Sequence, residues 1–214
     1  MWELFKAGGW LMLPLVLCSI FTVAISIERF IRLRHASVIP HDLTVTAKTE
    51  VQQIAQLLQQ DSKLTQSALG QVLFAGLSAK QENDQFARAQ MEAAASQEIH
   101  YLEKNINFLG TISAVSPLLG LLGTVIGIIE SFLVIDVGSN VSPTLMIPGI
   151  SKALIATAMG MVVAIPALIA YRYFQRLVQE YVAELEQQAT LFHAKLFYQR
   201  QKSAHDYDRT KDVA

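Results

Sequence analysis

The sequence contains little charge and a single cysteine. Only 16% of its 214 residues are Asp, Glu, Lys or Arg, whereas soluble domains carry about 25%. Because Cys18 stands alone, no disulfide can form within the chain. The histidines are scattered and show no ligand spacing, and we find no phosphate loop, dinucleotide fingerprint or catalytic triad. The sequence therefore predicts no metal, no cofactor and no enzymatic activity. Basic residues alternate with acidic ones, which argues against nucleic-acid binding.

The missing charge is confined to three long apolar runs. They cover residues 10–27, 106–135 and 147–171, and only Glu130 and Lys152 interrupt the last two. Each run is close to or above the ~20 residues that a helix needs to cross the hydrocarbon core of a bilayer. We therefore predict an all-α integral membrane protein with three transmembrane helices. Their predicted bounds are 10–27, 106–133 and 149–171.

The first apolar run could instead be a secretory signal. However, no cleavage site of small residues follows it, and the sequence continues directly into Arg29, Arg32 and Arg34. Positive charge after an apolar run is typical of a stop at the cytoplasmic face. We therefore favour a membrane span that stays in the protein.

The distribution of positive charge predicts the topology. Eight of the 17 Lys and Arg residues lie in 29–104 and seven in 172–211. The positive-inside rule places these regions in the cytoplasm and the N-terminus outside. The predicted order is an interfacial segment outside (1–9), span one, a cytoplasmic helical domain (28–105), span two, a periplasmic loop (134–148), span three, and a cytoplasmic C-terminal helix and tail (172–214).

The cytoplasmic regions show helical periodicity. Proline is absent from 41–116, and apolar residues recur with a 3.6-residue rhythm. No break separates the last of these stretches, from about Asp84, from span two, so we expect one continuous helix there. Span three also continues beyond Tyr171 without Pro or Gly. We therefore expect two spans to extend into a cytoplasmic helical bundle.

Small residues form a stripe on each of the last two spans. In span two the stripe is Gly120, Gly123 and Gly127, with Thr124 one turn after Gly120. Span three repeats the pattern with Ala153, Ala156, Thr157, Gly160 and Ala164. Two interpretations remain open. The stripes either pack helices closely within one subunit, or Thr124 and Thr157 line a shared lumen. Three spans cannot enclose a pore alone, so the second interpretation requires a homo-oligomer.

Glu130 and Lys152 are the charges within the two later spans, each near the outer end. An intramembrane charge costs about 2.5–3.5 kcal/mol on insertion scales and indicates function by default. The predicted topology puts both at similar depth, so we hypothesise that they pair or that both face a watery vestibule. The alternative is that they extend to the outer interface.

The two stripes also carry a family resemblance. Residues 117–127, PLLGLLGTVIG, followed by Phe132, resemble the second-span signature of the MotA/TolQ/ExbB proton-channel family. Residues 149–167, GISKALIATAMGMVVAIPA, followed by Tyr171, resemble its third-span signature. Flagellar MotA has four spans, so the three-span order is more similar to the ExbB and TolQ branches, and to ExbB slightly more.

The resemblance implies a homopentamer in the inner membrane of a Gram-negative bacterium. It would surround the single-span helices of an ExbD- or TolR-like partner, whose membrane aspartate takes and releases protons, and would act through a TonB- or TolA-like protein. The channel threonines of the family map onto Thr124 and Thr157. At Lys152 ExbB members often have Glu, so a role of that acid does not carry over. A TolQ-like role and a passive scaffold are the alternatives.

Overall fold

The computed structural model describes residues 9–46, 49–133 and 143–211, with side chains to residue 197. Every regular element in these ranges is a helix, and three helices are long and apolar enough to cross a membrane. The predicted all-α membrane fold is therefore confirmed. The expected interfacial segment and most of the expected periplasmic loop lie outside the described residues. The chain divides into two compact units, which are described separately.

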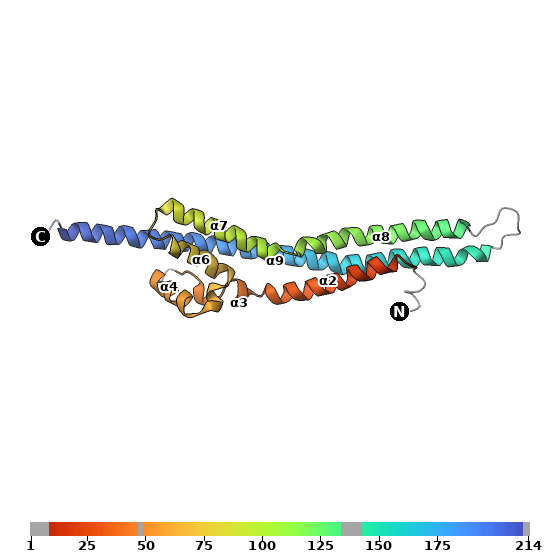
Figure 1. The fold of residues 1–214 in the computed structure, drawn as a ribbon, viewed down its shortest axis with the longest axis horizontal. Coiled ribbons are helices and arrows are strands. Elements are labelled where there is room, and N and C mark those ends of the chain that lie inside the picture. The colour runs from red at the N-terminus through yellow and green to blue at the C-terminus, as the bar shows by residue number, and fades with distance from the viewer. Residues whose placement is uncertain (1–8, 47–48, 134–142, 212–214) are drawn as a thin grey trace. The chain divides into compact units, whose positions relative to one another are not determined.

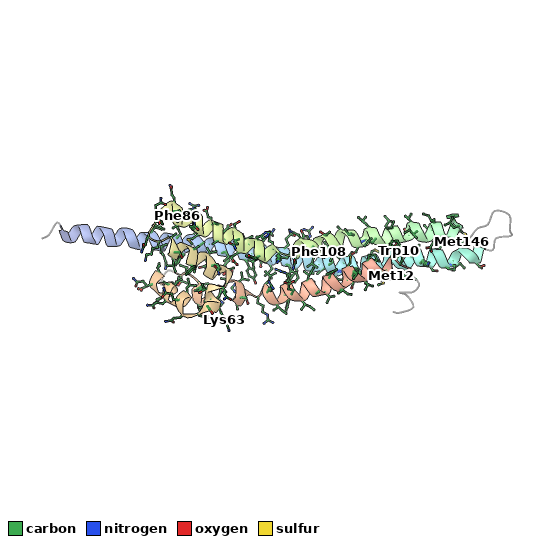
Figure 2. All side chains as sticks on the ribbon, viewed as in Figure 1. Trp10, Met12, Lys63, Phe86, Phe108 and Met146 are labelled. Carbon is green, nitrogen blue, oxygen red and sulfur yellow. The ribbon has the colours of Figure 1, made fainter. Side chains whose placement is uncertain are left out.

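The first unit contains the three apolar helices. It comprises the described residues up to Phe30 together with Asn105–Gln175. Its elements are α2 (Met12–Arg32), α8 (Ile106–Leu133), the short 3-10 helix η2 (Pro143–Met146) and the first part of α9 (Ile147–Lys211). Figure 1 shows α8 and this part of α9 lying side by side. Trp10 and Met12 mark the start of α2 (Figure 2).

The outward faces of these helices are apolar. Large side chains such as Leu118, Leu133 and Leu154 are more than 60% exposed. An apolar surface of this extent would be unfavourable in water and is typical of contact with lipid. The buried positions are instead small or sparse. On α2 they fall on one stripe at helical spacing: Met12, Leu15, Thr22, Ile25 and Arg29.

The helical course before span two contains a break that the sequence analysis did not anticipate. Residues 84–133 include a single candidate span of 50 residues. Nevertheless, α7 (Asp84–Glu103) ends before Lys104, and α8 begins at Ile106. Asn105 between them has a φ of 63°, in the left-handed region. Among non-glycine residues Asn tolerates this region comparatively well, so the interruption needs neither Pro nor Gly. The expectation of one unbroken helix is wrong at this point.

The second unit is a bundle of shorter helices around the later part of α9. It comprises Ile31–Lys104 and the residues from Arg176 onward. Its helices before α7 are α3 (His35–Val38), η1 (His41–Leu43), α4 (Val51–Gln60), α5 (Ser62–Thr65) and α6 (Ala68–Ser78). Side-chain caps start three of its helices. Asp61 accepts from the Lys63 amide at 2.8 Å, Ser67 from the Gly70 amide at 3.1 Å, and Asn83 from the Phe86 amide at 2.7 Å.

The later part of α9 anchors this bundle. Its buried side chains include Tyr181, Leu185, Phe192 and Leu196. The Tyr181 hydroxyl donates to the Leu33 carbonyl at 2.8 Å, and the Gln188 side-chain oxygen accepts from the Val45 amide at 2.7 Å. Two backbone polar groups between α2 and α4, the Leu33 carbonyl and the Val45 amide, thus find their hydrogen-bond partners on α9.

Candidate functional site

The small-residue stripes of α8 and α9 lie against each other within one chain. Gly120, Gly123 and Gly127 are all buried on α8. A Cβ built on Gly120 would lie 3.0 Å from the carbonyl oxygen of Ala156, and one built on Gly123 would overlap the Cβ of Ala156. Because even a methyl group lacks space here, the glycines allow direct backbone contact between the spans.

The same stripe continues along α9. Ala153, Ala156 and Ala164 are buried, and a Cβ on Gly160 would lie 2.7 Å from the Ser116 carbonyl oxygen. Residues with lower numbers on α8 contact residues with higher numbers on α9, so the two helices run antiparallel. Close packing within one subunit, one of the two interpretations of the stripes, is therefore present. It does not exclude a lumen beside them.

Thr124 and Thr157 lie at the edge of this contact, not at its centre. Both residues are half-buried. The Thr124 hydroxyl donates to the Leu121 carbonyl of its own helix at 2.7 Å. The Thr157 hydroxyl reaches across to the Gly120 carbonyl at 3.3 Å and also lies 3.4 Å from the Ala153 carbonyl. Each hydroxyl therefore has an acceptor and keeps its own oxygen lone pairs available.

Helical geometry places both threonines on the same flank of the α8–α9 pair. At about 100° per residue, Thr124 is rotated about 40° from Gly120, and Thr157 is rotated about 40° in the same sense from Ala153. The stripes of the two antiparallel helices face each other. Residues that are rotated equally and in the same sense from these stripes therefore lie on the same side of the helix pair. The two residues also lie at a similar position along the axis of the helix pair, because Thr157 contacts Gly120, one turn before Thr124.

Helix α2 lies on the opposite flank. Ile112 and Val163 are rotated about 80° in the other sense from Gly120 and Ala153, and with Ala167 they form a buried cluster. Cys18 of α2 packs against that cluster. The flank with the threonines is thus the one that α2 leaves uncovered in a single chain.

Glu130 and Lys152 form an ion pair. The Lys152 ammonium lies 2.9 Å from a Glu130 carboxylate oxygen, and the two side chains are 40% and 46% exposed. The pairing hypothesised from the sequence is therefore present. The pair lies on the α2 flank, since a Cβ built on Gly9, just before α2, would be 3.9 Å from Lys152 Cε. The structure thus separates this pair from Thr124 and Thr157.

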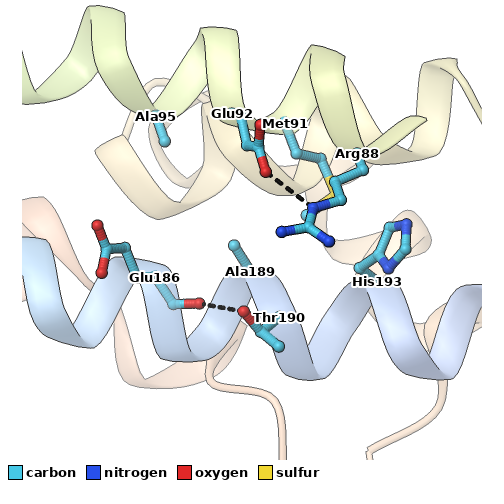
Figure 3. A pocket seen from close by; sticks show the side chains of 8 residues that line it. All are labelled: Arg88, Met91, Glu92, Ala95, Glu186, Ala189, Thr190 and His193. Carbon is cyan, nitrogen blue, oxygen red and sulfur yellow. Dashed lines mark hydrogen bonds and ion pairs between the residues drawn. The ribbon is translucent and has the colours of Figure 1, made fainter. Parts of the chain in front are cut away.

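The second unit contains a cavity of about 440 Å³ between α7 and α9. Figure 3 shows its walls, where Arg88 and Glu92 of α7 face α9. The Arg88 side chain bonds Glu92 at 2.8 Å, and this contact raises the pKa of the Arg88 guanidinium above its ordinary value. His193 lies 3.0 Å from a carboxylate oxygen of Asp84. Acidic and basic groups offset each other here, so the cavity does not select a ligand by charge.

A polar cluster at the C-terminal end of α2 was missed by the sequence analysis. Arg29, one of the positive charges that follow the first apolar run, is only 1% exposed. Its guanidinium lies 3.3 Å from Glu28, whose other carboxylate oxygen accepts from the Asn105 side chain at 3.2 Å. Glu28 within an otherwise basic segment was the available signal.

Comparison with known proteins decides the family. Residues 48–187, about two thirds of the chain, match the MotA/TolQ/ExbB proton channel family. The chain belongs to this family. The matched region includes both stripes and both threonines. Since family members are transport and motor subunits without enzymatic activity, the expectation that this chain is no enzyme is confirmed.

Individual relatives agree with this assignment. The chain is 32% identical to the "Putative biopolymer transport protein ExbB-like 1" of Synechocystis over 205 residues, which cover 91% of this chain and 80% of the relative. It is 38% identical to the "Tol-Pal system protein TolQ" of Haemophilus influenzae over half of this chain and 49% of that protein. It is 44% identical to the "Biopolymer transport protein ExbB" of Salmonella typhimurium over 40% of this chain and 35% of that one. The protein is accordingly a multi-pass membrane subunit of ExbB/TolQ type.

Proposed function

We propose that the protein is an ExbB-like subunit of an inner-membrane motor in a Gram-negative bacterium. In this proposal several copies, five by family resemblance, surround the single-span helices of an ExbD- or TolR-like partner. The N-terminus faces the periplasm and the C-terminus the cytoplasm. The complex uses the proton motive force to energise outer-membrane transport through a TonB-like protein.

The single observation that carries this proposal is the shared flank of Thr124 and Thr157. Two hydroxyls at a similar level on the flank that α2 leaves uncovered can line a lumen between copies. Such a lumen is apolar except for the hydroxyls. It would therefore accept a protonated carboxyl group more readily than an ionised one.

The partner must supply the group that carries the proton. Glu130 is the one carboxylate within the predicted spans. It lies near the outer end, is paired with Lys152, and is on the α2 flank. A membrane aspartate of the partner, facing the threonines, would complete the site. A proton crossing the membrane releases about 2.3 kcal/mol per 100 mV, which is several times RT and sufficient to bias movement of one subunit set inside another.

Replacing both threonines by valine tests the proposal. Thr124→Val with Thr157→Val keeps the side-chain shape but removes the hydroxyls, so we expect assembly with the partner to persist and proton-dependent activity to fall at least tenfold. Thr111→Val is the matched control, because Thr111 is an exposed threonine on the same helix, rotated about 180° from Gly120. Unchanged activity in the double variant would contradict a channel and favour a passive scaffold.

A TolQ-like role is the second candidate, supported by the match to TolQ over half of the chain. Expression in strains that lack one system or the other separates the two roles. We expect restoration of TonB-dependent uptake. Restored detergent resistance without restored uptake would instead assign the protein to envelope integrity.

A further inference from the structure

The described part of the first unit contains three basic side chains, and two of them are paired with its two carboxylates. Lys152 lies 2.9 Å from Glu130, and Arg29 lies 3.3 Å from Glu28. The third is Arg172 of α9, which is exposed and forms no ion pair with any described residue. Its charge is therefore not offset within the described part of this unit.

The ring of Tyr171 holds the Arg172 side chain at the end of span three. The central guanidinium carbon of Arg172 lies 5.8 Å from the centre of this ring, which is within the range of a cation–π contact. The ring is half-buried and occupies space that Gly110 of α8 leaves open. A Cβ built on Gly110 would lie 3.0 Å from Tyr171 Cε2. The contact with α8 thus fixes the ring, and the ring limits the directions open to the guanidinium.

Helical geometry places Arg172 on the threonine flank, the side of the α8–α9 pair that carries Thr124 and Thr157. Val163 lies in the buried cluster against which Cys18 of α2 packs. Arg172 follows Val163 by nine residues, which rotate the helix by about 180° beyond two full turns. Arg172 is therefore on the side of α9 that faces away from α2.

Arg172 also lies at one end of the proposed lumen. It is about 15 residues beyond Thr157, which corresponds to about 22 Å along the helix. In the proposed topology this end is the cytoplasmic mouth. A guanidinium presents a planar fork of N–H donors that matches the two oxygens of a carboxylate. In a closed ring of copies the threonine flank faces the lumen and not the bilayer, so a carboxylate that reaches this fork comes from the threaded partner.

We propose that Arg172 binds a carboxylate of the single-span partner at the cytoplasmic mouth of the lumen, and that Tyr171 is the positioning residue for this contact. The inference rests on the proposed motor function, in which the partner helix is threaded between copies. The matching Asp or Glu of the partner lies about 15 residues from its membrane aspartate, on the cytoplasmic side. The ion pair sets the depth of the partner in the bilayer and so keeps its aspartate level with Thr124 and Thr157.

The test uses the full-length protein, co-expressed with an ExbD- or TolR-like partner and reconstituted with it in lipid nanodiscs. The measured quantity is the temperature at which the partner dissociates, at low and at high NaCl. We expect Arg172→Gln to lower this temperature by several degrees at low salt, with a smaller difference at high salt, because ions screen an exposed charge pair. Arg172→Lys keeps the charge but not the fork and should lie between parent and Arg172→Gln. Arg34→Gln is the matched control, because Arg34 is an exposed arginine outside the α8–α9 pair.

A charge exchange identifies the carboxylate. Arg172→Glu should lower the dissociation temperature further than Arg172→Gln, because it brings like charges together. Partner variants with Lys in place of single Asp or Glu residues near the expected position are then combined with Arg172→Glu. One of these pairs should restore the dissociation temperature, which a purely structural role of the arginine would not allow. Tyr171→Leu should reproduce part of the loss, whereas Tyr171→Phe, which keeps the ring, should not.

Equal dissociation temperatures of parent and Arg172→Gln at low salt would overturn the proposal. A loss that no partner variant restores would also overturn it and would assign Arg172 to a lipid phosphate at the membrane surface. This readout needs no proton transport, so it is independent of the threonine test. A parent protein that binds no such partner would contradict the proposed function itself, whereas a parent that binds it as tightly as Arg172→Gln contradicts this inference alone.

Discussion

The hydroxyl of Thr157 lies 3.3 Å from the backbone carbonyl oxygen of Gly120 on the facing span. This contact joins the proposed channel residue to the glycine stripe, because Gly120 has no side chain that would cover its carbonyl group. The position of Thr157 thus depends on the close approach of α8 and α9. The following predictions test the contacts around it.

Thr157→Ser should retain proton-dependent activity within about twofold, whereas Thr157→Val should lose most of it. Serine keeps the hydroxyl that donates to Gly120, and valine replaces it with a methyl group of similar volume. The measurement is activity relative to the amount of assembled complex. Equal loss in both variants would show that the methyl group of the threonine matters, and not its hydroxyl.

Gly123→Ala should lower the thermal stability of the purified protein, and Ala156→Gly should restore much of it in the double variant. The added methyl group overlaps Ala156, and overpacking of this kind costs about 1–3 kcal/mol. Leu122→Ala, at an exposed position on the same helix, is the control and should change the midpoint little. Absence of rescue would show that the stripes do not face each other.

Neutralising one member of the ion pair should cost more than neutralising both. Glu130→Gln leaves Lys152 charged in an apolar environment, and Lys152→Gln does the same to Glu130; either change should cost about 1–3 kcal/mol. The double variant removes both charges and should recover part of this loss. A coupling energy near zero in this cycle would mean that water, and not the partner, satisfies each charge.

Glu98→Gln should stabilise the protein increasingly as the pH rises. Burial raises the pKa of the Glu98 carboxyl above its ordinary value of 4.5. A raised pKa in the folded state means that its contribution to stability is present below the ordinary value and is lost as the pH rises through the folded value. The glutamine variant resembles the protonated form and avoids that loss.

Thermal unfolding at about pH 4 and about pH 7 checks this prediction. The midpoints of parent and variant should be similar at the lower pH and differ at the higher one. Glu103→Gln on the same helix, at an exposed position, is the control. A difference that does not depend on pH would point to packing instead of ionisation.

The sequence was sufficient to predict the three spans, because their length and lack of charge leave few alternatives in a bilayer. It also offered a pairing of Glu130 and Lys152 as one of the possibilities, since the predicted topology puts them at similar depth, and the structure contains this pair. The break at Asn105 was not predictable in the same way. No Pro or Gly marks it, and the side-chain bond that Asn105 makes joins it to Glu28 of α2, 77 residues earlier in the sequence.

The candidate site was predictable only in part. Helical spacing identified Thr124, Thr157 and the small residues beside them, but it could not choose between packing and a lumen. The structure shows that the glycines and alanines meet at the contact and that the threonines lie at its edge. The burial of Arg29 was not predictable for a related reason: it depends on tertiary contacts that the local sequence does not reveal.

At Gly120, Gly123 and Gly127 the last two spans approach so closely that even a methyl group lacks space between them. These positions therefore offer no route for an ion between α8 and α9 of one chain. In the proposed motor a route for protons must lie between copies or beside a partner helix, so we expect variants that do not assemble to lose conduction even where the isolated subunit folds.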